Sequence, residues 1–123
     1  MAILKEFIIV GLGGFLGAGG RHVINVYLAE HTLRHGFHFG TLAVNIIGSF
    51  LIGLLAAQTS NHLRLFLVVG ILGGFTTFSA FSYETVGLLQ NGAVVKGLLN
   101  IFLNVTLCLI GVFIGLKTAK LFF

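Results

Sequence analysis

The chain has 123 residues, of which 57% are hydrophobic and only 8% are charged, and it contains 18 glycines but no proline or tryptophan. Soluble domains carry about 25% charged residues, so this composition excludes a soluble enzyme and a soluble nucleic-acid-binding domain. The net charge of +4 comes largely from lysines and arginines near the ends of apolar stretches, where such residues favour anionic lipid headgroups.

Four charge-poor stretches fill most of the chain and predict an all-α membrane protein with a single domain, residues 1–123. Transmembrane helices are expected at about 7–29, 39–57, 65–89 and 97–116, since a bilayer span needs about 20 apolar residues. Three further spans follow the first one, so the first is expected to be a retained helix rather than a cleaved signal peptide.

The first predicted helix contains a GxxxG pair, Gly13 and Gly17, and one internal cation, Arg21. Glycines at this spacing let another helix backbone approach closely in lipid. Arg21 either reaches the interface from the outer third of the helix or raises the local anion concentration near a pore mouth. The polar connection at 30–38 holds three histidines, but it is expected to be a solvated loop rather than a metal site.

Polar residues recur at helical spacing within the second and fourth predicted helices. Thr41 and Asn45 are four residues apart, as are Asn100, Asn104 and Cys108, so each set lies on one helix face. Buried asparagines either hydrogen-bond neighbouring helices or line a polar pathway. Two aligned polar faces together favour a pathway. As the only cysteine, Cys108 cannot form an internal disulfide.

The third predicted helix is interrupted near its middle by the segment 73–82, GGFTTFSAFS. Glycines are flexible and hydroxyl side chains compete for backbone hydrogen bonds, so a break is expected, with freed carbonyls able to coordinate Na⁺. Phe78 and Phe81 lie on one side, which Glu84 continues. The two aromatic rings face lipid, pack in the core or line a pathway. Glu84 either lies at the membrane interface or has a functional role.

The distribution of basic residues gives only a weak orientation signal. Both termini and the second connection should share one side, which holds Lys5, Arg64, Lys117 and Lys120, while the other side holds Arg34 and Lys96. Either both termini are cytoplasmic, or the chain inserts in both directions.

Taken together, these segments resemble the small bacterial fluoride channels of the Fluc or CrcB family. The resemblance covers the whole chain and rests on three segments, with a weaker match in the fourth helix, NIFLNVTLC. The three segments are GGFLGAGGRH at 13–22, GTLAVNIIGSFLIG at 40–53 and GILGGFTTFSAFSYE at 70–84.

This resemblance implies a passive, fluoride-selective channel in the bacterial plasma (inner) membrane that exports cytoplasmic fluoride and lowers its toxicity. It also implies an antiparallel, dual-topology homodimer with a structural Na⁺ at its centre, held by the backbone carbonyls of Gly73 and Thr76. Asn45, Phe78 and Phe81 would line the fluoride pathway. Further roles are implied for polar contacts at Thr41, Ser79 and Asn104, for Arg21 at the vestibule, and for Glu84 as an accessory residue.

Asparagines at 100 and 104 depart from the tyrosine or serine that many members of this family place on the fourth helix. A heterodimer of two paralogues is an alternative to the homodimer, but retention of Asn45, Phe78 and Phe81 favours the latter. Other functional classes are a small dual-topology multidrug or cation exporter and a non-conducting assembly subunit. The exporter would need an acidic residue in the middle of the first helix, and Glu6 lies at its start.

Overall fold

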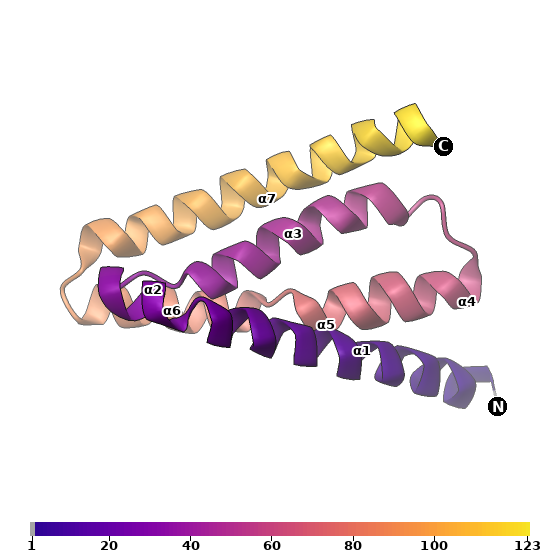
Figure 1. Ribbon diagram of the computed structural model, residues 1–123, viewed down its shortest axis with the longest axis horizontal. Coiled ribbons are helices and arrows are strands. Elements are labelled where there is room, and N and C mark those ends of the chain that lie inside the picture. Colours follow the sequence, from indigo (N-terminus) through magenta and orange to yellow (C-terminus); the bar gives the residue numbers. More distant parts are fainter. Residues whose placement is uncertain (1) are drawn as a thin grey trace.

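The computed structural model describes residues 2–123, and this part of the chain is helical with no strand. The elements are α1 (Ala2–Tyr27), α2 (Ala29–His35), α3 (Phe39–Leu55), α4 (Asn61–Arg64), η1 (Leu65–Leu72), α5 (Gly73–Phe75), α6 (Phe78–Gln90) and α7 (Val94–Phe122). α4, η1, α5 and α6 follow one another as one interrupted rod, Asn61–Gln90, which lies in a bundle with the rods formed by α1, α3 and α7 (Figure 1). The all-helical prediction is therefore confirmed for the described residues.

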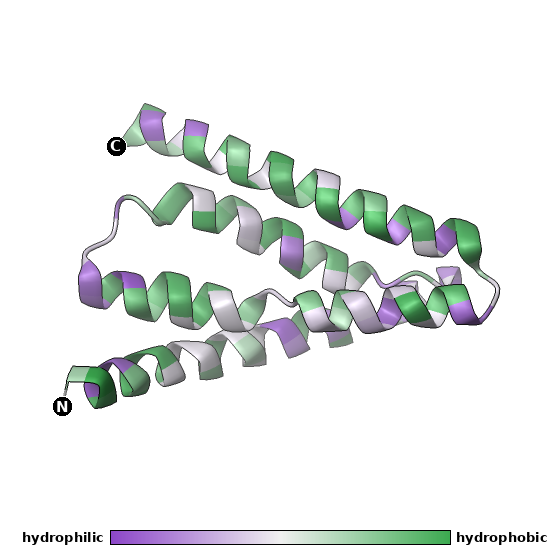
Figure 2. Cartoon of the chain, turned by 180° about the vertical axis from the view of Figure 1, so that it is seen from behind, coloured by the Kyte–Doolittle hydropathy of each residue, from purple (hydrophilic) through white to green (hydrophobic). Residues whose placement is uncertain are grey.

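The rods have the length and composition of membrane-crossing helices. Ala2–Tyr27, Asn61–Gln90 and Val94–Phe122 are long and apolar enough to span a bilayer, and α3 is a shorter apolar helix of 17 residues. At 1.5 Å per residue α3 is about 26 Å long, close to the thickness of a hydrocarbon core. Hydrophobic residues cover most of each rod, and hydrophilic ones gather mainly near the ends (Figure 2).

Helix boundaries differ from the expected ones where the sequence turns polar. α1 begins before residue 7, and α7 continues to Phe122 rather than ending near 116. Lysine and other long side chains are good helix formers in water, so these helices extend past the apolar stretch that defines the span.

The connection after α1 is not the solvated loop that its polarity predicts, because residues 29–35 form the short helix α2. An i,i+4 pair between Glu30 and Arg34, 3.1 Å apart, supports this helix. It ends at Gly36, whose φ of 63° is left-handed and whose N–H donates to the carbonyl of Thr32. A short helix without an apolar face gives no periodic signal, which explains the error.

Glycines bring two pairs of rods into backbone contact. The predicted GxxxG contact is confirmed: a Cβ added at Gly13 or Gly17 would overlap the carbonyl oxygen of Phe66 or Ile71 on η1. On the other side of the bundle, a Cβ at Gly115 of α7 would overlap the carbonyl of Phe50 on α3. α1 thus lies against η1, and α7 lies against α3.

Residues 65–72 are π-helical, which no feature of the sequence predicted. The N–H of Gly73 donates to the carbonyl of Val68, five residues earlier, as in a π-helix. This wider segment is the one that Gly13 and Gly17 contact, and the short helix α5 separates it from the residues at which the rod breaks.

Both chain termini lie at one end of the bundle with the α3–α4 connection, and α2 lies at the other end with the α6–α7 turn (Figure 1). A chain that runs along the bundle an even number of times begins and finishes at the same end, as the sequence predicts. The end with the termini carries Lys5, Arg64, Lys117 and Lys120.

We expect Gly17→Ala to lower the free energy of unfolding by about 1–3 kcal/mol, since the added methyl overlaps the Ile71 carbonyl. Gly11→Ala on the same helix is the matched control, because nothing lies within 4 Å of its added Cβ. It should be neutral or stabilising by up to about 1 kcal/mol. Unfolding of both variants in the same detergent measures this, and equal losses would contradict the contact.

Candidate functional site

The third rod breaks at two threonines. Thr76 has φ −84° and ψ 157°, and Thr77 has φ −152° and ψ 117°, so both are extended between α5 and α6. The predicted break is confirmed, but the glycines do not form it: Gly73 and Gly74 are helical. A Cβ at Gly74 would approach the Gly14 carbonyl to 2.7 Å, so this glycine allows α5 to pack closely against α1.

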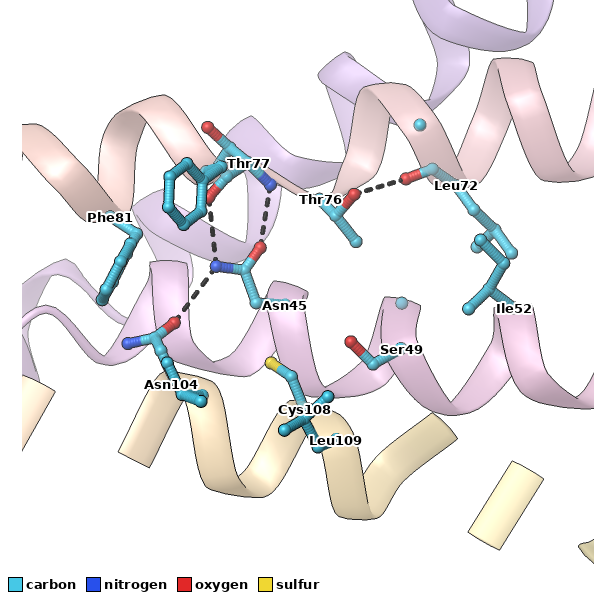
Figure 3. A pocket seen from close by; sticks show the side chains of 14 residues that line it. Asn45, Ser49, Ile52, Leu72, Thr76, Thr77, Phe81, Asn104, Cys108 and Leu109 are labelled. Atoms are coloured by element: carbon cyan, nitrogen blue, oxygen red, sulfur yellow. Dashed lines mark hydrogen bonds between the residues drawn. The ribbon is translucent and has the colours of Figure 1, made fainter. Parts of the chain in front are cut away.

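Asn45 of α3 joins both sides of the break through its side-chain amide (Figure 3). Its Oδ1 accepts the N–H of Thr77 at 2.8 Å, and its Nδ2 donates to the carbonyl of Thr77 at 3.1 Å. The same Nδ2 donates to Oδ1 of Asn104 on α7 at 3.1 Å. The amide thus replaces the backbone partners that Thr77 would have in a helix.

Two backbone carbonyls lose their helical donors at the break. In a continuous helix the N–H of Thr77 would bond the carbonyl of Gly73, but it bonds Asn45. The N–H of Ala80 would bond the carbonyl of Thr76, but it bonds the Thr77 hydroxyl at 3.1 Å. The carbonyls of Gly73 and Thr76 are therefore available as oxygen ligands.

A chain of side-chain hydrogen bonds continues from Asn45 through the core. Nδ2 of Asn104 donates to Oδ1 of Asn100 at 3.0 Å, and Nδ2 of Asn100 donates to the hydroxyl of Thr85 at 2.8 Å. Thr85 in turn donates to the carbonyl of Phe81 at 2.7 Å. Asn100 and Asn104 are buried, at 1% and 5% exposure. Both therefore hydrogen-bond neighbouring helices, which is one of the two alternatives, whereas the favoured alternative, a polar pathway, stays a prediction.

An open groove of about 400 Å³ runs beside the break. Phe81 and Phe78 meet there with ring centroids 5.3 Å apart, but Phe81 is buried whereas Phe78 is 76% exposed. The lining residues come from α3, the end of η1, α5, the break, α6 and α7: Asn45, Gly48, Ser49, Ile52, Leu72, Gly73, Thr76, Thr77, Phe78, Phe81, Asn104, Val105, Cys108 and Leu109.

Gly48 lets the side chain of Thr76 pack directly against α3 at this groove, because a Cβ there would overlap the Cγ2 atom of Thr76. The structure therefore brings together six of the predicted residues along one groove: Asn45, Phe78, Phe81, Asn104, Gly73 and Thr76.

The remaining predicted residues lie elsewhere. Thr41 donates to Oε1 of Glu84 at 2.5 Å, and these two form a separate polar group with His38. The hydroxyl of Ser79 is exposed and lies 3.3 Å from that of Thr77. Arg21 on α1 is half-buried, and within residues 2–123 it has no carboxylate within 4.0 Å.

Sequence reasoning missed Thr77 and His38. Thr77 lies within the predicted break but was not named as a site residue, and it is the residue that Asn45 bonds. Two adjacent threonines have a preference for extended backbone, which could have placed the break at these residues within the segment 73–82. His38 precedes α3 and meets Glu84 only in the tertiary structure. Between residues 2 and 123 no group of three histidine, cysteine or acidic residues could hold a metal ion.

Comparison with known proteins places this architecture in one family. The family described as CrcB-like protein, Camphor Resistance (CrcB), matches residues 8–116. A relative from Elusimicrobium minutum is 54% identical over 123 residues, covering 98% of each chain. Relatives from Clostridium perfringens and Campylobacter jejuni are 46% and 43% identical and cover 94% and 96% of this chain, and 94% and 100% of their own. All three are named fluoride-specific ion channel FluC.

Asn45→Asp should lower the free energy of unfolding by about 1–3 kcal/mol, because it removes both donated bonds and places a negative charge beside the Thr77 carbonyl. Hydrogen exchange at the amides of Thr77 and Ala80 should accelerate. Ser49→Ala, one turn along α3, is the control, since the Ser49 hydroxyl makes no hydrogen bond within residues 2–123. Equal stability and equal exchange in the two variants would show that Asn45 does not hold the break.

Proposed function

Because the chain belongs to the CrcB family, we propose that it is a fluoride-specific ion channel. It is a multi-pass membrane protein and a passive conduit rather than an enzyme. One structural observation supports this proposal independently of the relatives' names. The Asn45 amide, the broken third rod and the Phe78–Phe81 pair meet in one groove.

Fluoride is small and strongly hydrated, so a pathway must replace the water that the ion gives up. N–H and O–H donors can do so, and so can aromatic ring edges, which are electropositive because of the ring quadrupole. The groove offers the edges of Phe78 and Phe81 and the amides of Asn45 and Asn104 without a fixed cation that would trap the ion. Ser79, whose hydroxyl lies 3.3 Å from that of Thr77, and Thr41, which donates to Glu84, would add polar contacts outside the groove itself.

Both N–H groups of Asn45 are hydrogen-bonded within the chain, one to Thr77 and one to Asn104. The bond to Thr77 is one half of a two-way pair that holds the break. A fluoride ion would therefore replace the Oδ1 of Asn104 as the acceptor, leaving the pair with Thr77 intact.

The driving force for export is the membrane potential. Hydrogen fluoride enters cells as a neutral acid and dissociates in the less acidic cytoplasm, which traps the anion. An inside-negative potential expels one negative charge with about 2.3 kcal/mol per 100 mV, so a passive channel in a bacterial inner membrane lowers fluoride toxicity. Arg21 would raise the anion concentration at the vestibule.

In a single chain, residues that line the groove remain exposed, which supports a homodimer. Phe78, which lines the groove, is 76% exposed. Gly73, which also lines the groove, and Ser79 are exposed as well. A second, antiparallel copy would cover this face. Dual insertion accords with the weak difference in basic residues between the two ends of the bundle.

A structural Na⁺ fits the freed carbonyls of Gly73 and Thr76, because hard cations prefer oxygen ligands and helix breaks supply them. One chain provides two such oxygens, and two chains around a shared axis would provide twice as many. Bound there, the ion would hold the two breaks together rather than take part in conduction.

A proton-coupled multidrug or cation exporter was the alternative, and family membership favours the channel. Glu6 is exposed in the first turns of α1 and is not at the middle of that helix.

In liposomes containing the purified chain, a voltage should drive fluoride efflux with negligible chloride efflux, as read by ion-selective electrodes. Phe81→Ile should slow fluoride efflux about two- to tenfold, the equivalent of an aromatic contact of about 0.5–1.5 kcal/mol. Phe15→Ile on α1 is the control, because Phe15 is 77% exposed and remote from the groove. Silence for both ions in the unsubstituted protein would refute the self-sufficient channel.

In detergent the protein should have the mass of two chains, and Na⁺ should raise its unfolding temperature relative to N-methylglucamine at the same ionic strength. A ligand at 100 times its dissociation constant stabilises the folded state by about 2.7 kcal/mol. Light scattering and thermal unfolding measure the two effects. A single-chain mass would overturn the dimer, and identical unfolding in both salts would overturn the Na⁺ site.

A further inference from the structure

The Glu84 carboxylate lies in the half of the bundle that ends at α2 and the α6–α7 turn, and it is incompletely hydrogen-bonded. Thr41 donates to Oε1 at 2.5 Å, but Oε2 is buried and has no hydrogen-bond partner among residues 2–123. A buried carboxylate oxygen without a donor is costly. The group therefore favours an additional cationic partner.

Among residues 2–123, His38 is the one basic side chain with a nitrogen within 4.0 Å of this carboxylate, and it approaches Oε1 rather than the unpartnered Oε2. It immediately precedes α3, and its Nδ1 lies 3.8 Å from Oε1 of Glu84. The side chain of His38 is 38% exposed, whereas that of Glu84 is only 13% exposed. The imidazole is therefore accessible to water on one side while it faces an enclosed carboxylate. A cavity of about 290 Å³ adjoins both side chains.

No other charged group competes for this carboxylate. Tyr83 lines the same cavity but is itself largely exposed. On α7, which packs against α6, Lys96 donates to the carbonyl of His35 at 2.9 Å. On α2, Arg34 pairs with Glu30. Within residues 2–123, no lysine or arginine nitrogen lies within 4.0 Å of Glu84.

We propose that His38 is a positioning residue for Glu84 and that this pair makes anion conduction through the chain depend on pH, an inference that rests on the proposed function. A histidine ordinarily changes charge between pH 5 and 8. Protonated His38 carries a positive charge 3.8 Å from the carboxylate and offsets its negative charge. Neutral His38 leaves an uncompensated negative charge on α6 three residues from Phe81, which lines the groove, and this charge repels anions. Conduction is therefore faster at the lower pH.

The test is fluoride efflux from liposomes at pH 6 and pH 8, corrected with protein-free vesicles for leakage of hydrogen fluoride. The wild-type rate should be about two- to fivefold higher at pH 6, as expected for a partly exposed ion pair. His38→Gln should reduce this ratio to near one. Glu84→Gln should do the same, and the double variant should add nothing further.

His31→Gln is the matched control, because His31 is an exposed histidine at the same end of the bundle and should keep the wild-type ratio. A ratio that persists in His38→Gln, or disappears in His31→Gln, would overturn the pair. Wild-type efflux with no dependence on pH would overturn this inference and leave the channel intact. Absence of wild-type efflux at both pH values would instead overturn the proposed function. If His38→Gln does not fold, Glu84→Gln still decides the question.

Discussion

The two-way hydrogen bond between the Asn45 amide and the backbone of Thr77 is the interaction on which this architecture depends. A break in a membrane helix leaves peptide groups without partners, and lipid supplies none. Asn45 supplies both a donor and an acceptor to the same residue, as a neighbouring strand would. The break is therefore held in one conformation, in which the carbonyls of Gly73 and Thr76 do not receive the backbone donors that they would have in a continuous helix.

Other features of the bundle follow from keeping Asn45 at this position. Its second donor joins α7 through Asn104, and the chain of amides continues to α6 through Asn100 and Thr85. The extended segment is thus anchored to both neighbouring helices. Gly48 leaves room for the side chain of Thr76, so the break fits closely over α3 instead of being pushed away from it.

The polar residues separate into two groups with different chemistry. The group around Asn45 is neutral and adjoins the aromatic pair, which suits the passage of a dehydrated anion. The group of Thr41, Glu84 and His38 is ionisable and only partly hydrogen-bonded, which suits control of the local charge. Helical spacing placed Glu84 with Phe81, since both lie on α6, but it could not show that His38 and Thr41 surround the carboxylate.

Apolar length was enough to predict four helices, and the glycine spacing predicted the contact made by Gly13 and Gly17, because both signals are local and periodic. The threonine pair, rather than the glycines, forms the break, and α2 and the π-helical segment carried no periodic pattern. Which donors meet which acceptors was decided only by the packing of α3 against α6 and α7. Asn45 and Thr77 are 32 residues apart, so their pairing is a property of the folded bundle.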